Sequence, residues 1–160
     1  MDTDASGYLS TPMRETRHLF TILPTLVPAD ESLYGVAQSG IRNPGARVIS
    51  VIEEQRKLVG VIPVAAVIEH LLLEFASPVV LSTTPTIIQT RKLAHHLGVH
   101  QAQDIMQQPA SVPVSGTVGD ALRLMQLRSL RGLPMTDEQG RVVGYVDQLE
   151  LLTAQIHAYR

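Results

Sequence analysis

The chain has 160 residues, enough for one compact domain or two small ones. Hydrophobic residues make up 44% and charged residues 18%, which excludes general disorder and permits a buried core. Aromatic residues make up only 4%, and 13 Lys and Arg stand against 15 Asp and Glu, so the composition argues against a nucleic-acid partner. Without cysteine there is no disulfide, thiolate metal site or Cys nucleophile, which fits a reducing compartment.

Signals for export and membrane insertion are missing from the sequence. Residues 1–7 are acidic and polar, unlike the basic start and apolar run of a signal peptide. The longest uncharged apolar stretch, residues 58–68, is shorter than the roughly 20 residues that cross a bilayer. We therefore expect a cytoplasmic protein without membrane insertion, in which residues 1–15 form a flexible leader.

Two blocks of sequence occur twice, in the same order. Residues 24–28, Pro-Thr-Leu-Val-Pro, return 85 residues later as Pro-Ala-Ser-Val-Pro at 109–113. Residues 53–60 return 84 residues later at 137–144, and both segments end in Val-Gly. Because one deletion between the blocks reconciles the two offsets, the pattern indicates an internal duplication.

The first part of each copy combines a short strand with a capped helix. The strand is expected around Val27 in the first copy and around Val112 in the second. A polar turn follows, and then a hydroxyl residue, Ser32 or Thr117, that suits the N-cap of a helix.

The second part of each copy is a predicted hairpin and a final helix. Gly140 supplies the positive φ that a tight hairpin turn needs, whereas Arg56 holds that place in the first copy, so we expect a different or slightly strained turn there. The expected strands cover residues 48–52 and 58–62, then 133–136 and 141–146, and the final helices cover 64–75 and 148–158. The order is therefore β-α-β-β-α, twice.

A linker over residues 76–100 separates the copies. Thr84 and Pro85 suit an N-cap and the first position of a helix, and Gly98 suits a helix end, so a connecting helix is expected from about residue 85 to 97.

Three histidines near the end of this linker, His95, His96 and His100, invite a metal interpretation. Gly98 interrupts the helical face that His96 and His100 would share, and no third ligand is apparent. We prefer the interpretation that these histidines are solvated parts of the linker, and we expect no metal. A pH-sensitive contact is the alternative.

The second copy carries an ordered set of short motifs. They are Asp104-Ile105-Met106, Thr117-Val118, Leu133-Pro134, residues 140–146 and Glu150-Leu151-Leu152. This set resembles the CBS motif, a β-α-β-β-α unit that pairs with a second copy to form a Bateman module. The first copy resembles it more weakly, through Ser32-Leu33, residues 48–51 and residues 57–62.

The resemblance implies a fold and a domain organisation. The fold class is α+β, with two β-α-β-β-α CBS repeats packed as a pseudo-two-fold pair and joined through a connecting helix. CBS repeat 1 is then expected over residues 16–75, the linker over 76–100, and CBS repeat 2 over 101–160.

The resemblance also implies a regulatory or sensor module, not an enzyme. Paired CBS motifs commonly bind adenosyl ligands such as AMP, ATP or S-adenosylmethionine between the repeats, and two modules often associate. We therefore expect a homodimer that requires no cofactor, binds an adenosyl ligand and acts on a regulated protein partner. A dimerisation or scaffold module with a degenerate nucleotide site is the alternative.

The family's ligand motif runs from the last strand into the last helix as Gly, two apolar residues, Thr or Ser, two variable residues and Asp. The hydroxyl and the helix amides hold phosphate, and the Asp accepts from ribose. In the first copy, Pro63 and Ala66 replace the hydroxyl and the carboxylate, and neither side chain makes the expected hydrogen bond. Ribose recognition through this motif is therefore not expected in the first copy.

In the second copy, Asp147 and Glu150 hold the same two positions. Glu150 can accept from ribose with a longer reach, while Asp147 repels phosphate unless a cation intervenes, which favours adenosine, a sulfonium compound or a metal-bound nucleotide. The alternative is a capping pair at the helix start, and one carboxylate can serve both purposes. The backbone around Val112, Val114 and Leu133-Pro134 is expected to frame the base.

Two further features leave alternatives open. Arg123, Arg128 and Arg131 form a basic group that suits either phosphate binding or a solvated helix end. The predicted helix over residues 64–75 is apolar nearly all round, which fits either a dimer interface or an ordinary core helix. No nucleophile motif, phosphate loop or paired catalytic carboxylates can be assigned, so no catalytic residue is proposed.

Overall fold

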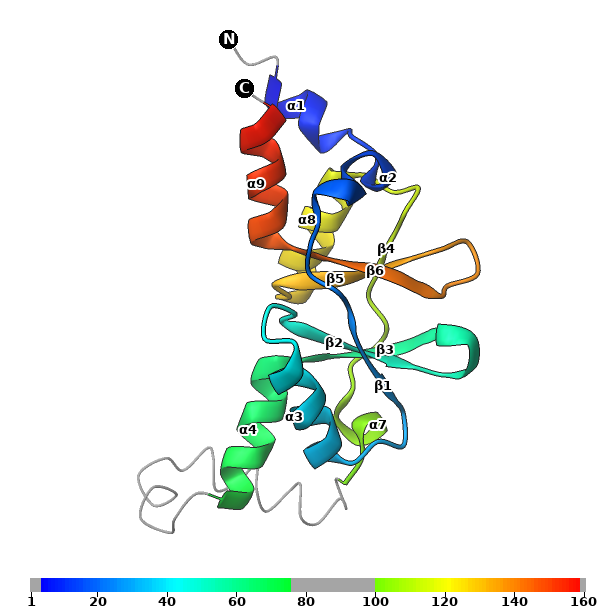
Figure 1. The fold of residues 1–160 in the computed structure, drawn as a ribbon, viewed down its shortest axis with the longest axis vertical. Coiled ribbons are helices and arrows are strands. Elements are labelled where there is room, and N and C mark those ends of the chain that lie inside the picture. Colours follow the sequence, from blue (N-terminus) through cyan, green and yellow to red (C-terminus); the bar gives the residue numbers. More distant parts are fainter. Residues whose placement is uncertain (1–3, 76–99, 159–160) are drawn as a thin grey trace.

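The computed structural model describes residues 4–75 and 100–158, which form four layers with two sheets in the middle and helices outside them (Figure 1). The first repeat contains β1 (Thr25–Pro28), α3 (Leu33–Arg42), β2 (Val48–Ile52), β3 (Leu58–Pro63) and α4 (Val64–Phe75). The second contains β4 (Val112–Pro113), α8 (Val118–Arg128), β5 (Gly132–Thr136), β6 (Val142–Asp147) and α9 (Gln148–Ala158). The predicted α+β fold with β-α-β-β-α twice is confirmed, and the connecting helix expected near residues 85–97 lies outside the described residues.

The two sheets have the same topology and the same irregularity. Their strand orders are β1-β2-β3 and β4-β5-β6, and in each sheet the first pair is parallel and the second pair antiparallel. The register of the antiparallel pair shifts between Val51 and Ile52 in one sheet and between Met135 and Thr136, their equivalents, in the other. A shared register shift at equivalent residues is strong support for the duplication.

Both predicted N-caps are present. The Ser32 hydroxyl accepts from the Gly35 amide at 3.0 Å at the start of α3. Thr117 accepts from the Asp120 amide at 3.1 Å, and the Asp120 carboxylate accepts in return from the Thr117 amide at 3.0 Å. These side chains satisfy amides that the first helical turn leaves unpaired, which explains where both helices begin.

The hairpin turns differ as the sequence predicts. Gly140 has a φ of 76°, which costs glycine little. In the first repeat, Gln55 and Arg56 have φ values of 57° and 63° within a short 3-10 turn, η2 (Glu54–Arg56). The first turn is therefore strained, since a residue with a Cβ loses about 1–2 kcal/mol in this region.

Backbone hydrogen bonds join each repeat to the segment that precedes the other repeat. We call residues 11–14 and 100–103 the leading segments. The first leading segment lies on repeat 2, where Met13 donates to the Gly116 carbonyl at 2.8 Å and the Val118 amide donates to Thr11 at 3.0 Å.

The second leading segment makes the equivalent bonds to repeat 1. Ala102 donates to the Glu31 carbonyl at 2.8 Å, and the Leu33 amide donates to His100 at 3.2 Å. The hairpins also meet at equivalent positions, because Lys57 and Arg141 form a β-bridge and Leu58 donates to Gly140 at 3.1 Å. These paired contacts define a pseudo-two-fold relation between the repeats.

Residues 4–15, expected as part of a flexible leader, instead form helices that pack on repeat 2. They are α1 (Asp4–Leu9) and the first residues of α2 (Met13–Thr16), which runs into a short 3-10 turn, η1 (Arg17–Leu19). Met13 is fully buried, and the Tyr8 hydroxyl donates to the Leu151 carbonyl of α9. The expectation failed because these short helices are stabilised by tertiary contacts and not by a periodic pattern of their own.

The apolar core has two parts. Val27, Val36, Ile49, Val51 and Ile62 pack with other residues between the first sheet and its helices. A larger cluster contains residues from both repeats. It includes Val48 and Val61 of repeat 1 and Leu133, Tyr145 and Val146 of repeat 2. The two repeats are therefore joined by apolar burial as well as by hydrogen bonds. No helix among residues 4–75 and 100–158 is both long and apolar enough to span a bilayer.

We expect Met13→Ala to lower the free energy of unfolding by about 2–5 kcal/mol, because the substitution leaves a cavity where α2 meets repeat 2. Chemical denaturation measures this change. Arg14→Ala, at an exposed position on the same helix, is the matched control and should change stability by less than about 0.5 kcal/mol. Equal effects of the two substitutions would contradict a docked α2.

Candidate functional site

The predicted ligand position in repeat 2 lies where β6 ends and α9 begins. Asp147 is buried, and its Oδ1 accepts from the Leu149 amide at 2.8 Å. Glu150, in the first turn of α9, accepts from the Asp147 amide through Oε2 at 3.4 Å. The two carboxylates thus form the capping pair that the sequence offered as one interpretation.

Glu150 also contacts the chain that leads into β1 of repeat 1. Its Oε1 accepts from the Thr21 amide at 2.6 Å and from the Ile22 amide at 3.0 Å. The Thr21 hydroxyl lies 3.4 Å from the same oxygen. One half-buried carboxylate therefore joins the last helix of repeat 2 to the chain that leads into the first strand of repeat 1, and Oε2 keeps capacity for a further donor.

The four residues expected to frame a base lie on the sheet of repeat 2. Val112 pairs with Met135, Leu133 with Val146, and Pro134 with Tyr145. Val114 follows β4 and donates to the Thr136 carbonyl at 3.0 Å. Because Val112, Leu133 and Pro134 are buried, their side chains belong to the core, and any contact they make with a ligand would come from the backbone.

Repeat 1 lacks the corresponding acceptors. Pro63 ends β3, and Ala66 lies in the first turn of α4, at the positions equivalent to Asp147 and Glu150. The amide of Val64, which opens α4, donates to the Arg47 carbonyl at 3.0 Å. Of the two helix starts, only that of α9 carries carboxylates for a ribose hydroxyl.

Tyr145 makes a contact between the repeats that no local sequence pattern predicts. Its hydroxyl accepts from the Arg47 amide at 2.9 Å, and burial raises the pKa of the phenol far above its ordinary value. A Cβ at Gly132 would collide with the Tyr145 side chain, so the close approach requires glycine there. The only sequence signal was its position between Gly144 and Val146 in the second copy of the motif.

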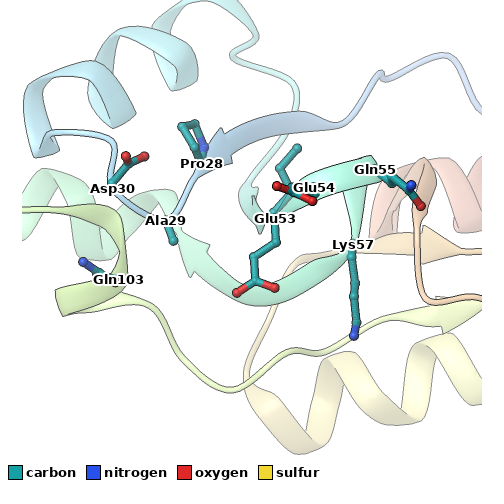
Figure 2. A pocket seen from close by; sticks show the side chains of 9 residues that line it. Pro28, Ala29, Asp30, Glu53, Glu54, Gln55, Lys57 and Gln103 are labelled. Carbon is teal, nitrogen blue, oxygen red and sulfur yellow. The ribbon is translucent and has the colours of Figure 1, made fainter.

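Among the cavities formed by the part of the chain that the structure describes, three involve strands, helices or the hairpin of repeat 1, and none of these three is lined by Glu150 or Asp147. The first, of about 780 Å³, lies beside the first hairpin. Figure 2 shows Asp30 and Gln103 on one side of it and Glu53 and Glu54 on the other, with Lys57 as its one basic residue. Three carboxylates and one ammonium make it an acidic cavity.

The second cavity is basic and the third is apolar. The basic cavity, of about 500 Å³, lies between the two hairpins and is lined by Arg17, Arg56 and Arg141 among others. The apolar cavity, of about 300 Å³, lies between α3 and α4, with Ile41, Ile68 and Leu71 in its lining.

The other predicted polar groups make ordinary structural contacts. Arg123 lies 3.5 Å from Asp120 on the exposed face of α8, and Arg128 donates to the Gln108 carbonyl at 2.8 Å. Arg131 is exposed. His95 and His96 lie outside the described residues, within which no group of three potential ligands is arranged to hold a metal ion.

Known proteins share this fold, and one family model matches the sequence. The model of the CBS domain matches residues 102–157. A CBS domain-containing protein from Thermotoga maritima is 24% identical, with a TM-score of 0.70 over 91% of this chain and 94% of its own. CBSX2 of Arabidopsis thaliana, solved in complex with AMP, is 19% identical, with a TM-score of 0.65 over 93% and 98%.

A third similar structure is the CBS domain pair of protein MJ0100, solved with 5′-methylthioadenosine and S-adenosyl-L-methionine. It is 16% identical, with a TM-score of 0.62 over 94% of this chain and 98% of its own. No curated protein matches the chain.

These findings confirm the resemblance to the CBS motif. The chain has the fold of a pair of CBS domains, the class that its two sheets and four flanking helices define. Within it, residues 102–157 match the model of the CBS domain.

Glu150→Ala removes the acceptor shared by Thr21 and Ile22, so we expect faster hydrogen exchange of both amides and a loss on the order of 1–2 kcal/mol in unfolding free energy. Amide exchange followed by NMR and chemical denaturation measure the two effects. Glu150→Gln, which keeps an acceptor oxygen, should fall between wild type and Glu150→Ala. Unchanged exchange at Thr21 and Ile22 in Glu150→Ala would show that the carboxylate does not hold this segment.

Proposed function

We propose that the protein is a regulatory module that binds an adenosyl ligand at the start of α9 and transmits its binding to a protein partner. The observation that carries the proposal is the position of Glu150, which contacts both repeats at once. The AMP complex of CBSX2 and the 5′-methylthioadenosine and S-adenosyl-L-methionine complexes of MJ0100 support the ligand class.

The charges at this position select among adenosyl compounds. Asp147 and Glu150 place two carboxylates beside the amides that open α9, so a bare phosphate meets repulsion there. A ribose donates its hydroxyls to a carboxylate without that cost. The site therefore favours adenosine, a sulfonium compound such as S-adenosylmethionine, or a nucleotide that carries a metal ion.

Ligand binding would change the contact between the repeats. A ribose that donates both of its hydroxyls to Glu150 engages Oε1 as well as Oε2, and so competes with the Thr21 and Ile22 amides for Oε1. Release of these amides frees the chain leading into β1, and the angle between the sheets can then change. Because a ligand shifts an equilibrium only through its different affinity for the two arrangements, this competition is the source of the signal.

Thermal shift and calorimetry with adenosine, AMP, ATP with and without magnesium, and S-adenosylmethionine test the proposal. We expect at least one adenosyl compound to raise the melting temperature by mass action, with the sulfonium compound ahead of magnesium-free ATP. Glu150→Ala should abolish the response, while Glu53→Ala, which removes a carboxylate from the acidic cavity, should leave it intact. No response to any compound at millimolar concentration would favour a scaffold module without ligand.

The last helices support a second proposal, that the module is a homodimer. Ile68 and Leu72 of α4 are 51% and 60% exposed, and their equivalents Leu152 and Ile156 of α9 are 52% and 54% exposed. The pseudo-two-fold relation thus places matching apolar stripes on both repeats. A second copy presents the same two stripes, so a two-fold contact covers all of them together.

We expect the double variant Ile68→Lys with Leu152→Lys to be monomeric in sedimentation and light-scattering measurements, because the new charges would be buried in the contact. Leu23→Lys, at a 74% exposed residue outside the helices, is the control and should remain dimeric. A monomeric wild type, or a double variant that stays dimeric, would overturn the homodimer proposal.

A further inference from the structure

The basic cavity between the hairpins is formed by residues of both repeats. Gln55 and Arg56 come from the first hairpin, and Asp137 and Arg141 come from the second. Arg17 belongs to the η1 turn that precedes repeat 1. The cavity has a volume of about 500 Å³, which accommodates a small ion with its hydration water. A ligand in this cavity would contact both hairpins.

Three guanidinium groups line this cavity against one carboxylate. Asp137 is already paired, because it lies 2.7 Å from Arg141 Nε and accepts from the Gln139 and Arg141 amides at 2.9 Å. Burial raises the pKa of Asp137, but the hydrogen bonds from Arg141 and Gln139 outweigh this effect and keep the pKa below its usual range. The carboxylate therefore stays ionised, and the lining as a whole keeps a positive excess.

The guanidinium groups of Arg17, Arg56 and Arg141 have N–H donors that make no hydrogen bond within the described residues. Arg17 uses NH2 in a 2.6 Å bond to the Val143 carbonyl, which directs its side chain toward β6. Arg141 uses Nε and NH2, with Asp137 and Gln139 as acceptors. Within the described residues the Arg56 side chain has no hydrogen bond or ion pair. Since each guanidinium has five N–H donors, an anion in the cavity finds several of them free.

The backbone at Arg56 adds an independent argument. Gln55 and Arg56 both adopt left-handed φ values, while the equivalent turn of repeat 2 has glycine at 140 and no such strain. Strain of this kind persists where the surrounding structure or a function maintains it. The strained turn places Arg56 in the lining of a cavity that Arg17 and Arg141 also line.

We propose that this cavity binds a multiply charged phosphate group, separately from the adenosyl position at α9. Its guanidinium lining suits the bidentate geometry of phosphate oxygens. The acidic cavity on the same hairpin, with Asp30, Glu53 and Glu54, repels the same anion. A phosphate held by Arg56 and Arg141 links the two hairpins and stabilises their present arrangement.

Titration calorimetry with inorganic pyrophosphate at low ionic strength tests the proposal. We expect one site per chain, weakened about tenfold or more by Arg56→Gly and by Arg17→Gln, because each removes a charged donor. Arg56→Gly also relieves the strained φ, so this variant should fold at least as stably as wild type. Added salt should weaken binding in wild type.

Two control variants separate the cavity from general electrostatics. Gln55→Gly relieves the same turn but keeps Arg56, and because it removes a neutral side chain from the cavity lining, it should weaken pyrophosphate binding less than Arg56→Gly does. Lys57→Gln removes one positive charge from the other face of the hairpin and should change affinity less than about twofold. No binding by wild type, equal losses in Lys57→Gln and Arg56→Gly, or full affinity in Arg56→Gly would each overturn the proposal.

The Glu150→Ala variant distinguishes this site from the adenosyl position. It should keep pyrophosphate binding whatever its response to adenosyl compounds, since Glu150 does not line the cavity. Loss of pyrophosphate binding in Glu150→Ala would move the anion to α9 and overturn the cavity as its site. Failure of the adenosyl panel alone would leave the pyrophosphate result unaffected.

Discussion

Backbone hydrogen bonds between each repeat and the leading segment of the other repeat determine how the two halves fit together. Met13 donates to Gly116, and Ala102 makes the equivalent bond to Glu31, both at 2.8 Å. A single hydrogen bond of this kind contributes only about 0.5–1.5 kcal/mol, but each set lies beside buried apolar residues such as Met13 and Ala102. The two halves therefore share the larger of the two apolar clusters, and a change in either half reaches the other directly.

The contacts at Glu150 and Tyr145 follow from this arrangement. Because the sheets face each other, the start of α9 lies beside the chain that leads into β1, and a carboxylate in the first turn of α9 can reach Thr21 and Ile22. Tyr145 makes a second connection by accepting from Arg47 before β2. Repeat 1 has Ala66 in place of the carboxylate, so the pair is symmetric in its backbone and asymmetric in its chemistry. Such asymmetry is consistent with the single adenosyl position proposed at α9.

Local features of the fold could be predicted from the sequence because they depend on short-range rules. Ser32 and Thr117 cap their helices through bonds to residues three positions away, and the contrast between Arg56 and Gly140 correctly indicated a strained first turn. The docking of α1 and α2 could not be predicted, since Met13 is buried in a cluster that includes residues of the distant repeat 2. The bond between Thr21 and Glu150 spans 129 positions, and no local pattern indicates it. The sequence did identify Glu150 and Asp147 as a capping pair, which the geometry reproduces.

The exchange of leading segments bears on how such a chain could arise. An ancestral polypeptide with one repeat would have its leading segment directly before that repeat. In the present arrangement, each leading segment donates to a carbonyl of the other repeat, Gly116 or Glu31, and not to one of the repeat that it precedes. Two ancestral molecules would satisfy those carbonyls by exchanging arms, and gene fusion would then convert an obligate association into a single polypeptide. After such a fusion the two halves would be free to diverge, which would account for acidic groups at the final helix of one half and proline and alanine at the equivalent positions of the other.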